Sequence, residues 1–204
     1  MSSNIAGADM GQTPPPRASS HVTHTRPVAR TLERAVVHLA HLGLFFLGDD
    51  FLGRGVRVWI LRRLGARIGA RARLHGGTYV SRPRNLVVGP ETFVNRGCYM
   101  DLEAKLVLGS RVAVGHGATF ITSRHEIGPH DQRCGEFQGA DVVVGDGTWI
   151  GANVTVLPGV TVGRGAVIAA GSVVLHEIQD DVLAAGVPAS PRRTLNRDPG
   201  SSLD

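Results

Sequence analysis

The sequence predicts a mainly β fold in which short parallel strands wind into a solenoid. Between residues 141 and 175, aliphatic residues recur at every sixth position: Val144, Ile150, Val156, Val162, Ile168 and Val174. Neither the 3.6-residue helical period nor the two-residue alternation of a free strand explains this spacing. Small residues follow these positions where the backbone must turn tightly, at Gly145, Gly151, Gly163 and Ala169. Each repeat therefore supplies one strand and one corner.

Stacking of successive coils explains why the repeats must be consecutive. One repeat cannot bury its own aliphatic side chain, but a stack of coils can. A coil of eighteen residues places Val144 under Val162, and the same spacing relates Ile150 to Ile168 and Val156 to Val174.

Composition limits the classes of protein that need to be considered. The 204 residues suffice for one sizeable domain with ragged ends. The formal charge of +5 is carried by arginine, since Lys105 is the only lysine, and it suits an anionic ligand or an acidic surface. The arginines are scattered without interleaved aromatics, which argues against nucleic-acid binding.

Two features predict a cytoplasmic location. The first twenty residues lack the apolar core of an export signal, and the only cysteines, Cys98 and Cys134, are expected to be free thiols. The most apolar run, Ala35 to Leu47, is too short to span a bilayer. Peripheral contact with a membrane is compatible with this sequence.

The composition and spacing of the N-terminal residues predict a disordered segment followed by a helical cap. Residues 1–27 are rich in Pro, Ser and Thr and hold little to bury. Within the predicted cap, residues 28–66, two segments at helical spacing are expected to pack on the first coil. The first, residues 29–47, has an apolar face of Leu32, Val36, Leu39, Ala40, Leu44 and Leu47; the second, residues 51–64, has Val56, Trp59, Ile60 and Leu64.

The repeat domain is predicted to span residues 67–193 and to contain about five coils. Its inward positions before the unbroken tract are Ile68, Leu74, Val80, Val88, Val94, Met100, Leu108, Val114 and Phe120. A break at residues 81–86 contains Pro83. The longest interruption, the inserted loop 121–141, is polar and has no apolar rhythm, so we expect an irregular loop with a function. We expect residues 194–204 to form a flexible tail.

Three motifs carry a resemblance to a known family. The segments TWIGANVTVLPGVTVG, AAGSVV and AAGVPAS resemble the hexapeptide-repeat acyltransferases, in the branch of the maltose, galactoside and nodulation-factor O-acetyltransferases. The similarity covers Ile68 to Arg193. It implies a left-handed parallel β-helix, a homotrimer with active sites between subunits, acetyl-CoA in the groove between adjacent prisms, and no metal.

The resemblance implies a general base and an oxyanion donor for acyl transfer to a hydroxyl. We predict His125 as the base, because imidazole titrates near neutral pH and the family places its catalytic histidine in this loop. His130 and His116 are weaker candidates and are interpreted as structural or surface residues. The backbone N–H of Ala152 is expected to stabilise the oxyanion.

The acceptor site is predicted around the segment FVNRGCYMDLE. Asn95 matches a sugar-contacting position of the family. Asp101 or Glu103 is expected to supply an acidic group, although the family's usual carboxylate position is occupied by Leu102. The alternative for these acids is hydrogen bonding to nearby backbone N–H groups.

The CoA site is predicted from the same resemblance. Trp149 is expected to flank the pantetheine arm or to pack in a subunit interface, and both roles are compatible. Three residues, Ala170, Gly171 and Ser172, align with the groove, while Arg192 and Arg193 are candidates for the nucleotide phosphates. Ser190 and His176 stand where the family often has basic residues.

The leading interpretation is an acyl-CoA-dependent O-acyltransferase, most simply an O-acetyltransferase, acting on a sugar or a glycosylated small molecule. One alternative is a metal-dependent hydratase of the γ-carbonic-anhydrase type, with ligands drawn from His125, His130, His116 and His75. The other alternative is a non-catalytic trimeric scaffold.

Overall fold

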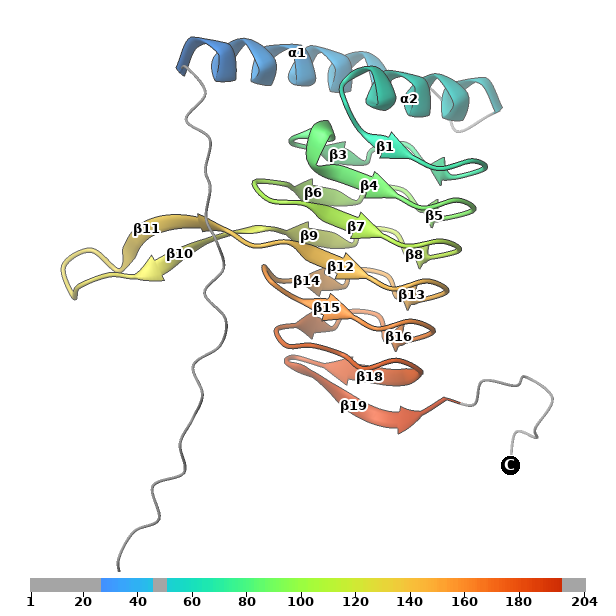
Figure 1. Cartoon of the computed structure of the whole chain (residues 1–204), viewed down its shortest axis with the longest axis vertical. Coiled ribbons are helices and arrows are strands. Elements are labelled where there is room, and N and C mark those ends of the chain that lie inside the picture. Colours follow the sequence, from blue (N-terminus) through green and yellow to red (C-terminus); the bar gives the residue numbers. More distant parts are fainter. Residues whose placement is uncertain (1–26, 46–50, 196–204) are drawn as a thin grey trace, which may run out of the picture.

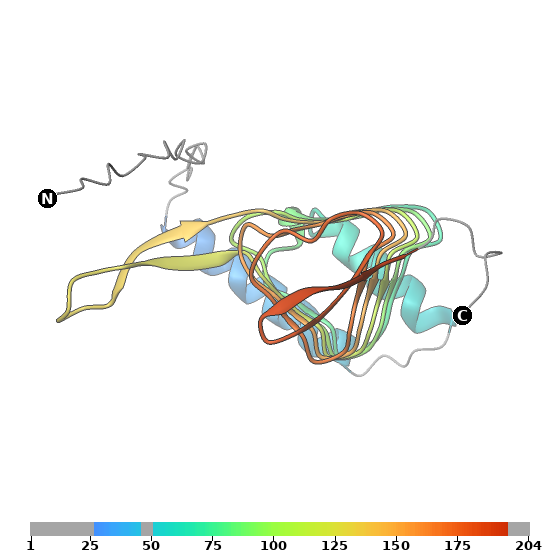
Figure 2. The ribbon, with the colours of Figure 1, turned by 90° about the horizontal axis from the view of Figure 1, so that it is seen from below.

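The computed structural model describes residues 27–45 and 51–195. Short parallel strands wind into a three-sided prism, and two helices lie across its N-terminal end (Figure 1). The view along the prism shows the triangular cross-section (Figure 2). Its three faces are called sheets A, B and C in the order in which each coil visits them.

Each complete coil contributes one strand to each sheet. The first coil contains β1 (Arg67–Ile68), β2 (Arg73–Leu74) and β3 (Tyr79–Val80). The second has β4 (Leu86–Val88), β5 (Phe93–Val94) and β6 (Tyr99–Asp101); the third has β7 (Leu106–Leu108), β8 (Ala113–Val114) and β9 (Thr119–Ile121). The fourth has β12 (Val142–Val144), β13 (Trp149–Ile150) and β14 (Thr155–Val156); the fifth has β15 (Thr161–Val162), β16 (Val167–Ile168) and β17 (Val173–Val174).

The predicted repeat register is confirmed. Val144 pairs with Val162, Ile150 with Ile168 and Val156 with Val174 in parallel ladders. The inward positions predicted from Ile68 to Val174 are all buried. Five coils are complete, and a sixth begins at the Ile178 bridge and β18 (Val182–Gly186). The winding hand stays a prediction from the resemblance.

Glycine at the corners lets the coils stack at close range. A Cβ atom added to Gly115 would lie 2.5 Å from the backbone nitrogen of Ala152 in the next coil. At Gly145 it would lie 2.6 Å from the nitrogen of Arg164. Both distances are below van der Waals contact, so the glycines at these corners are required by coil-to-coil packing.

The helical cap is confirmed, but only part of the predicted apolar face of each helix is buried: Leu44 is buried as predicted, and Ile60 and Leu64 are half-buried. Helix α1 (Pro27–Phe45) buries Val37 and Leu44, whereas Leu32, Val36 and Leu39 are exposed. Helix α2 (Phe51–Arg63) buries Arg57 and Leu61, whereas Val56 and Trp59 are exposed. Leu47 lies outside the described residues.

Hydrogen bonding at the open edge of the first coil explains this orientation. Arg62 Nη2 donates to the carbonyl of Ile68 at 2.6 Å, and Arg57 Nη1 donates to that of Leu74 at 3.2 Å. On the third side, the N–H of Val80 donates to His41 Nε2 at 3.2 Å. Each strand of the first coil thus has a cap side chain bonded to its main chain. A polar helix face is needed here because unpaired buried backbone groups are costly.

The predicted irregular loop 121–141 is instead a β-hairpin. Strand β10 (Ser123–Ile127) pairs antiparallel with β11 (Cys134–Gly139), and the hairpin projects from the prism between sheets C and A (Figures 1 and 2). Backbone pairing between the two polar segments stabilises them without an apolar face, so the sequence carried no periodic signal. The earlier break at 81–86 contains a 3-10 turn, Pro83–Asn85.

The remaining predictions concern the chain ends and the thiols. Strand β19 (Ala189–Thr194) pairs antiparallel with β18 and closes the last coil, as predicted. Cys98 and Cys134 are free thiols, as predicted. Of the segments expected to be disordered or flexible, 1–27 and 194–204, Pro27 belongs to α1 and Thr194 to β19, and residues 1–26 and 196–204 lie outside the described residues. Neither α1 nor α2 is long and apolar enough to span a membrane.

Candidate active site

The predicted site residues lie on two different edges of the prism, on either side of sheet C. Asn95, Ala152, Ala170 and Gly171 follow strands of sheet B and lie on the edge between sheets B and C. Asp101, Glu103 and the hairpin with His125 lie on the edge between sheets C and A. We call these the BC edge and the CA edge.

The BC edge presents a continuous row of exposed backbone. Asn153 N donates to the carbonyl of His116 at 2.9 Å, and Gly171 N donates to that of Ala152 at 2.8 Å, so the corners stack in register. Trp149 on β13 precedes this edge and is 57% exposed. The predicted CoA residues of the fourth and fifth coils are therefore neighbours in space.

The remaining predicted CoA residues lie near the C-terminal end of the prism. Ser172 is buried, and its hydroxyl accepts a hydrogen bond from Gly186 N at 3.1 Å. Its side chain thus ties β18 to the fifth coil. Arg192 and Arg193 are exposed on β19, and Arg192 Nη2 donates to the carbonyl of Ala185 at 3.2 Å.

His125 is held on the hairpin by its own strand partner. Its Nδ1 lies 2.9 Å from the carbonyl oxygen of Gly135 on β11, and its ring meets Phe137 edge to face at 5.3 Å. A carbonyl oxygen only accepts, so Nδ1 carries the proton and Nε2 of the neutral ring keeps its lone pair. The imidazole is exposed.

A pocket at the CA edge gathers both predicted acids with groups that the sequence reasoning missed. It has a volume of about 330 Å³ and is lined by Val37, His38, Tyr79, Ser81, Arg82, Tyr99, Asp101 and Glu103. The rings of Tyr79 and Tyr99 stack at 5.3 Å with an interplanar angle of 14°. These tyrosines occupy equivalent positions, one residue before inward Val80 and Met100. Aligning the coils would have revealed this pair.

The two acids have defined partners, and the predicted acceptor residues are not all brought together. Arg82 forms an ion pair with Glu103. Asp101 Oδ2 accepts a hydrogen bond from Ser123 Oγ at the base of the hairpin, at 2.6 Å. Leu102 between them is fully buried in the prism, so the chain has a core residue where the family usually has a carboxylate. Asn95 lies on the BC edge, apart from this pocket.

Other titratable groups are separate from these positions. His130 lies in the hairpin turn, and His75 packs against Phe93 at 4.9 Å. Across residues 27–45 and 51–195, no three His, Cys, Asp or Glu side chains form a group that could hold a metal ion. Burial raises the pKa of the Cys98 thiol to about 11, which makes it a poor nucleophile at neutral pH.

Comparison with known proteins agrees with the repeat and with the fold. A family model described as bacterial transferase hexapeptide (six repeats) matches residues 141–176. Galactoside O-acetyltransferase of Escherichia coli (strain K12) is 28% identical over 137 residues, covering 67% of this chain and 68% of that enzyme. Across its curated relatives, the chain spans 55–68% of their length.

Two solved structures extend the similarity to most of the chain. A hexapeptide-repeat acetyltransferase from Vibrio cholerae O1 biovar eltor, complexed with acetyl-CoA, has a TM-score of 0.75 and 26% identity, covering 84% of this chain and 91% of that one. A maltose O-acetyltransferase from Clostridium difficile 630 has a TM-score of 0.75 and 27% identity, covering 83% and 89%.

The prism and its stacked corner residues form a parallel β-solenoid, and its fourth and fifth coils match the hexapeptide transferase family model. Most of the chain is similar to acetyltransferases with this repeat, among them galactoside and maltose O-acetyltransferases.

Proposed function

We propose that this chain transfers an acetyl group from acetyl-CoA to a hydroxyl of a sugar or a glycosylated small molecule, with His125 as general base. The observation that carries the proposal is the hydrogen bond between His125 Nδ1 and the Gly135 carbonyl. It holds the ring in the tautomer whose Nε2 accepts the hydroxyl proton. The acetyl-CoA complex of the V. cholerae relative supports the donor.

The pocket at the CA edge is the proposed acceptor site. The stacked Tyr79 and Tyr99 offer an aromatic surface against which an apolar face of a sugar ring packs. Asp101 and Glu103 accept hydrogen bonds from hydroxyl groups, and Arg82 donates. This combination of aromatic and polar groups favours a neutral polyol over an aliphatic alcohol. Asp101, Glu103 or both accept these hydrogen bonds from the acceptor.

Transfer then proceeds in one ternary complex. Nε2 of His125 takes the hydroxyl proton as the hydroxyl oxygen attacks the thioester carbonyl. The backbone N–H of Ala152 donates to the oxyanion of the tetrahedral intermediate. Collapse of the intermediate breaks the C–S bond, and the imidazolium returns the proton to the departing thiolate, which leaves as the CoA thiol.

The separation of the two edges supports a homotrimer as the active assembly. His125 projects from the CA edge on a hairpin, whereas Ala152, Ala170 and Gly171 belong to the BC edge. A second copy that places its BC edge against this hairpin brings base and oxyanion donor together. Trp149 then lines the CoA arm in the groove between prisms, with Asn95 on the same edge and Arg192 and Arg193 nearest the phosphates.

The test is the rate of CoA thiol release with a panel of sugar acceptors and mass detection of the acetylated product. His125→Ala is expected to lower turnover by about 10²–10⁴-fold, because general-base catalysis supplies that range. His130→Ala is the matched control, since it lies on the same hairpin, and is expected to stay near the wild-type rate. Wild-type turnover in His125→Ala, with an unchanged assembly by size-exclusion chromatography, would contradict the proposal.

A further inference from the structure

The cap has an apolar surface that points away from the prism. On α1, Leu32 is 67% exposed and Leu39 is 69% exposed, and Val36 and Leu42 extend the same stripe. On α2, Trp59 is 57% exposed, with Val56 beside it. We call these six residues the outer cap face.

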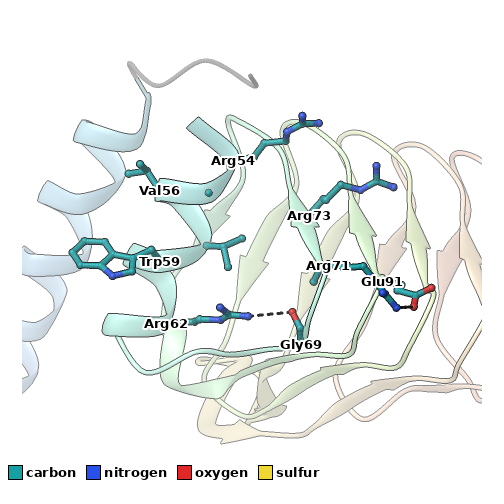
Figure 3. A pocket seen from close by; sticks show the side chains of 11 residues that line it. Arg54, Val56, Trp59, Arg62, Gly69, Arg71, Arg73 and Glu91 are labelled. Atoms are coloured by element: carbon teal, nitrogen blue, oxygen red, sulfur yellow. Dashed lines mark hydrogen bonds and ion pairs between the residues drawn. The ribbon is translucent and has the colours of Figure 1, made fainter. Parts of the chain in front are cut away.

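Helix geometry places this face opposite the prism on both helices. Leu39 follows buried Val37 by two residues, and Trp59 follows buried Arg57 by two, which is about 200° around the helix axis in each case. Figure 3 shows Val56 and Trp59 directed away from the strands. The two helices lie across the end of the prism (Figure 1), so both outer sides are available to one flat surface.

Positive charge is concentrated in the same part of the chain. Residues 51–90 contain nine arginines and no Asp or Glu, although the rest of the sequence has more acidic than basic residues. Arg63 lies over the indole of Trp59, with Cζ 5.1 Å from the ring centroid. This pairs an apolar anchor with a cation on the outer side of α2.

A basic groove adjoins this surface between α2 and the first coil. It has a volume of about 1020 Å³, and Arg54, Arg71, Arg73 and Trp59 are among the residues that line it. Arg71 is neutralised by an ion pair with Glu91. Figure 3 shows the guanidinium groups of Arg54 and Arg73 pointing in a common direction, and among the described residues neither has an acidic partner.

We propose that the outer cap face binds the surface of an anionic phospholipid bilayer. Leucines of α1 and Trp59 enter the boundary between headgroups and acyl chains, as in helices that lie in the membrane plane. Arg63, which lies over Trp59, contacts the headgroup phosphates, whereas Arg54 and Arg73, whose guanidinium groups point toward the strand side of α2, add electrostatic attraction to the anionic surface. Charge favours a bilayer over a second copy of this chain, because two caps face to face would oppose their arginines. The proposal goes beyond acetyl transfer and does not depend on it.

Flotation of the full-length protein with vesicles tests the proposal. Binding is expected with phosphatidylcholine vesicles that contain phosphatidylglycerol, and it is expected to weaken at high salt and with phosphatidylcholine alone. The double variant Leu32→Ser/Leu39→Ser should weaken binding by about tenfold or more, since less apolar area enters the bilayer. Arg54→Gln/Arg73→Gln should weaken it on the order of tenfold, and only with anionic vesicles.

The matched control is Val187→Ser, an exposed apolar residue outside the cap, which should bind as wild type does. Circular dichroism and size-exclusion chromatography verify that each variant keeps its fold and assembly. Failure of the wild-type protein to float with anionic vesicles would overturn the proposal, as would equal binding by the leucine variant. Concentration-dependent self-association that Leu32→Ser/Leu39→Ser abolishes, without lipid binding, would assign the face to a second copy instead. Turnover with a water-soluble acceptor reports separately on the proposed catalysis.

Discussion

Most buried side chains of the prism are apolar, and the few buried hydroxyl groups, such as those of Thr92 and Thr148, donate to backbone carbonyls at the corners. Several side chains that the cap directs onto the prism are instead long and polar. Phe120 is fully buried between Met100 and Val156 of neighbouring coils. Arg57 is almost as fully buried, yet it donates to a carbonyl of the first coil. The strands of an inner coil have their backbones paired to the coils above and below, so their inward side chains are free to be apolar. The first coil has no coil above it, so it needs hydrogen-bond partners.

This contrast predicts that mutations in the two regions act through different terms of the folding free energy. In the prism, truncation removes apolar contact and leaves a cavity. In the cap, truncation leaves a buried carbonyl without a donor.

The largest effect is expected in the prism. Phe120→Ala should lower the free energy of unfolding by about 3–5 kcal/mol, because a fully buried ring is replaced by a void. Urea unfolding at one fixed protein concentration measures the loss. Leu39→Ala on the outer side of α1 is the matched control and should change stability by less than about 0.5 kcal/mol. Similar losses in both variants would contradict the difference in packing.

A smaller effect is expected where the cap meets the first coil. Arg57→Met keeps the length of the side chain but removes the donor to Leu74, so stability should fall by about 1–3 kcal/mol. Arg63→Met, on the solvent side of the same helix, is the control and should stay within about 0.5 kcal/mol of wild type. A neutral or stabilising result for Arg57→Met would show that apolar packing suffices at the end of the prism.

The smallest effect is expected from protonation of His41. Burial is the main cause that lowers the pKa of His41 below its usual 6.5, and it outweighs a hydrogen bond to the Val80 backbone that raises the pKa. The unfolded chain then binds a proton more readily than the folded one. The stabilisation that neutral His41 contributes is complete above pH 6.5, and it is lost as the pH falls toward the lower pKa that His41 has in the folded protein. Thermal unfolding of His41→Gln across this window should show a flatter pH dependence; an unchanged slope would assign the dependence to other groups, such as His38.

The same contrast explains how far the fold could be predicted from the sequence. A six-residue repeat constrains every coil at once, so Val144, Ile150 and Val156 predict their partners as well as their burial. Helical periodicity predicts only that a segment has two faces. Which face of α1 or α2 is buried depends on the open backbone edge of the first coil, a property of the neighbouring element that no residue within the helices encodes.

The candidate site was predictable where it follows the repeats. Ala152, Ala170 and Gly171 are placed by the register, and the position of Trp149 before the same edge follows from it. The support of His125 by Gly135 could not be predicted, because the hairpin pairs polar segments through their backbones. Tyr79 lies near Asp101 because the first coil is twenty residues long and pairs Tyr79 with Tyr99, two residues before Asp101.

The closure of both ends of the prism bears on how the protein avoids growing into fibres. A stack of parallel coils with bare edges is a template for adding further strands from other molecules. At one end Arg62, Arg57 and His41 occupy the main-chain groups of the first coil. At the other end β19 pairs antiparallel with β18 and carries Pro191, which has no N–H to offer a new strand. Growth by further strands is therefore opposed at the first coil and, at the other end, in sheet B, where β19 is the outermost strand.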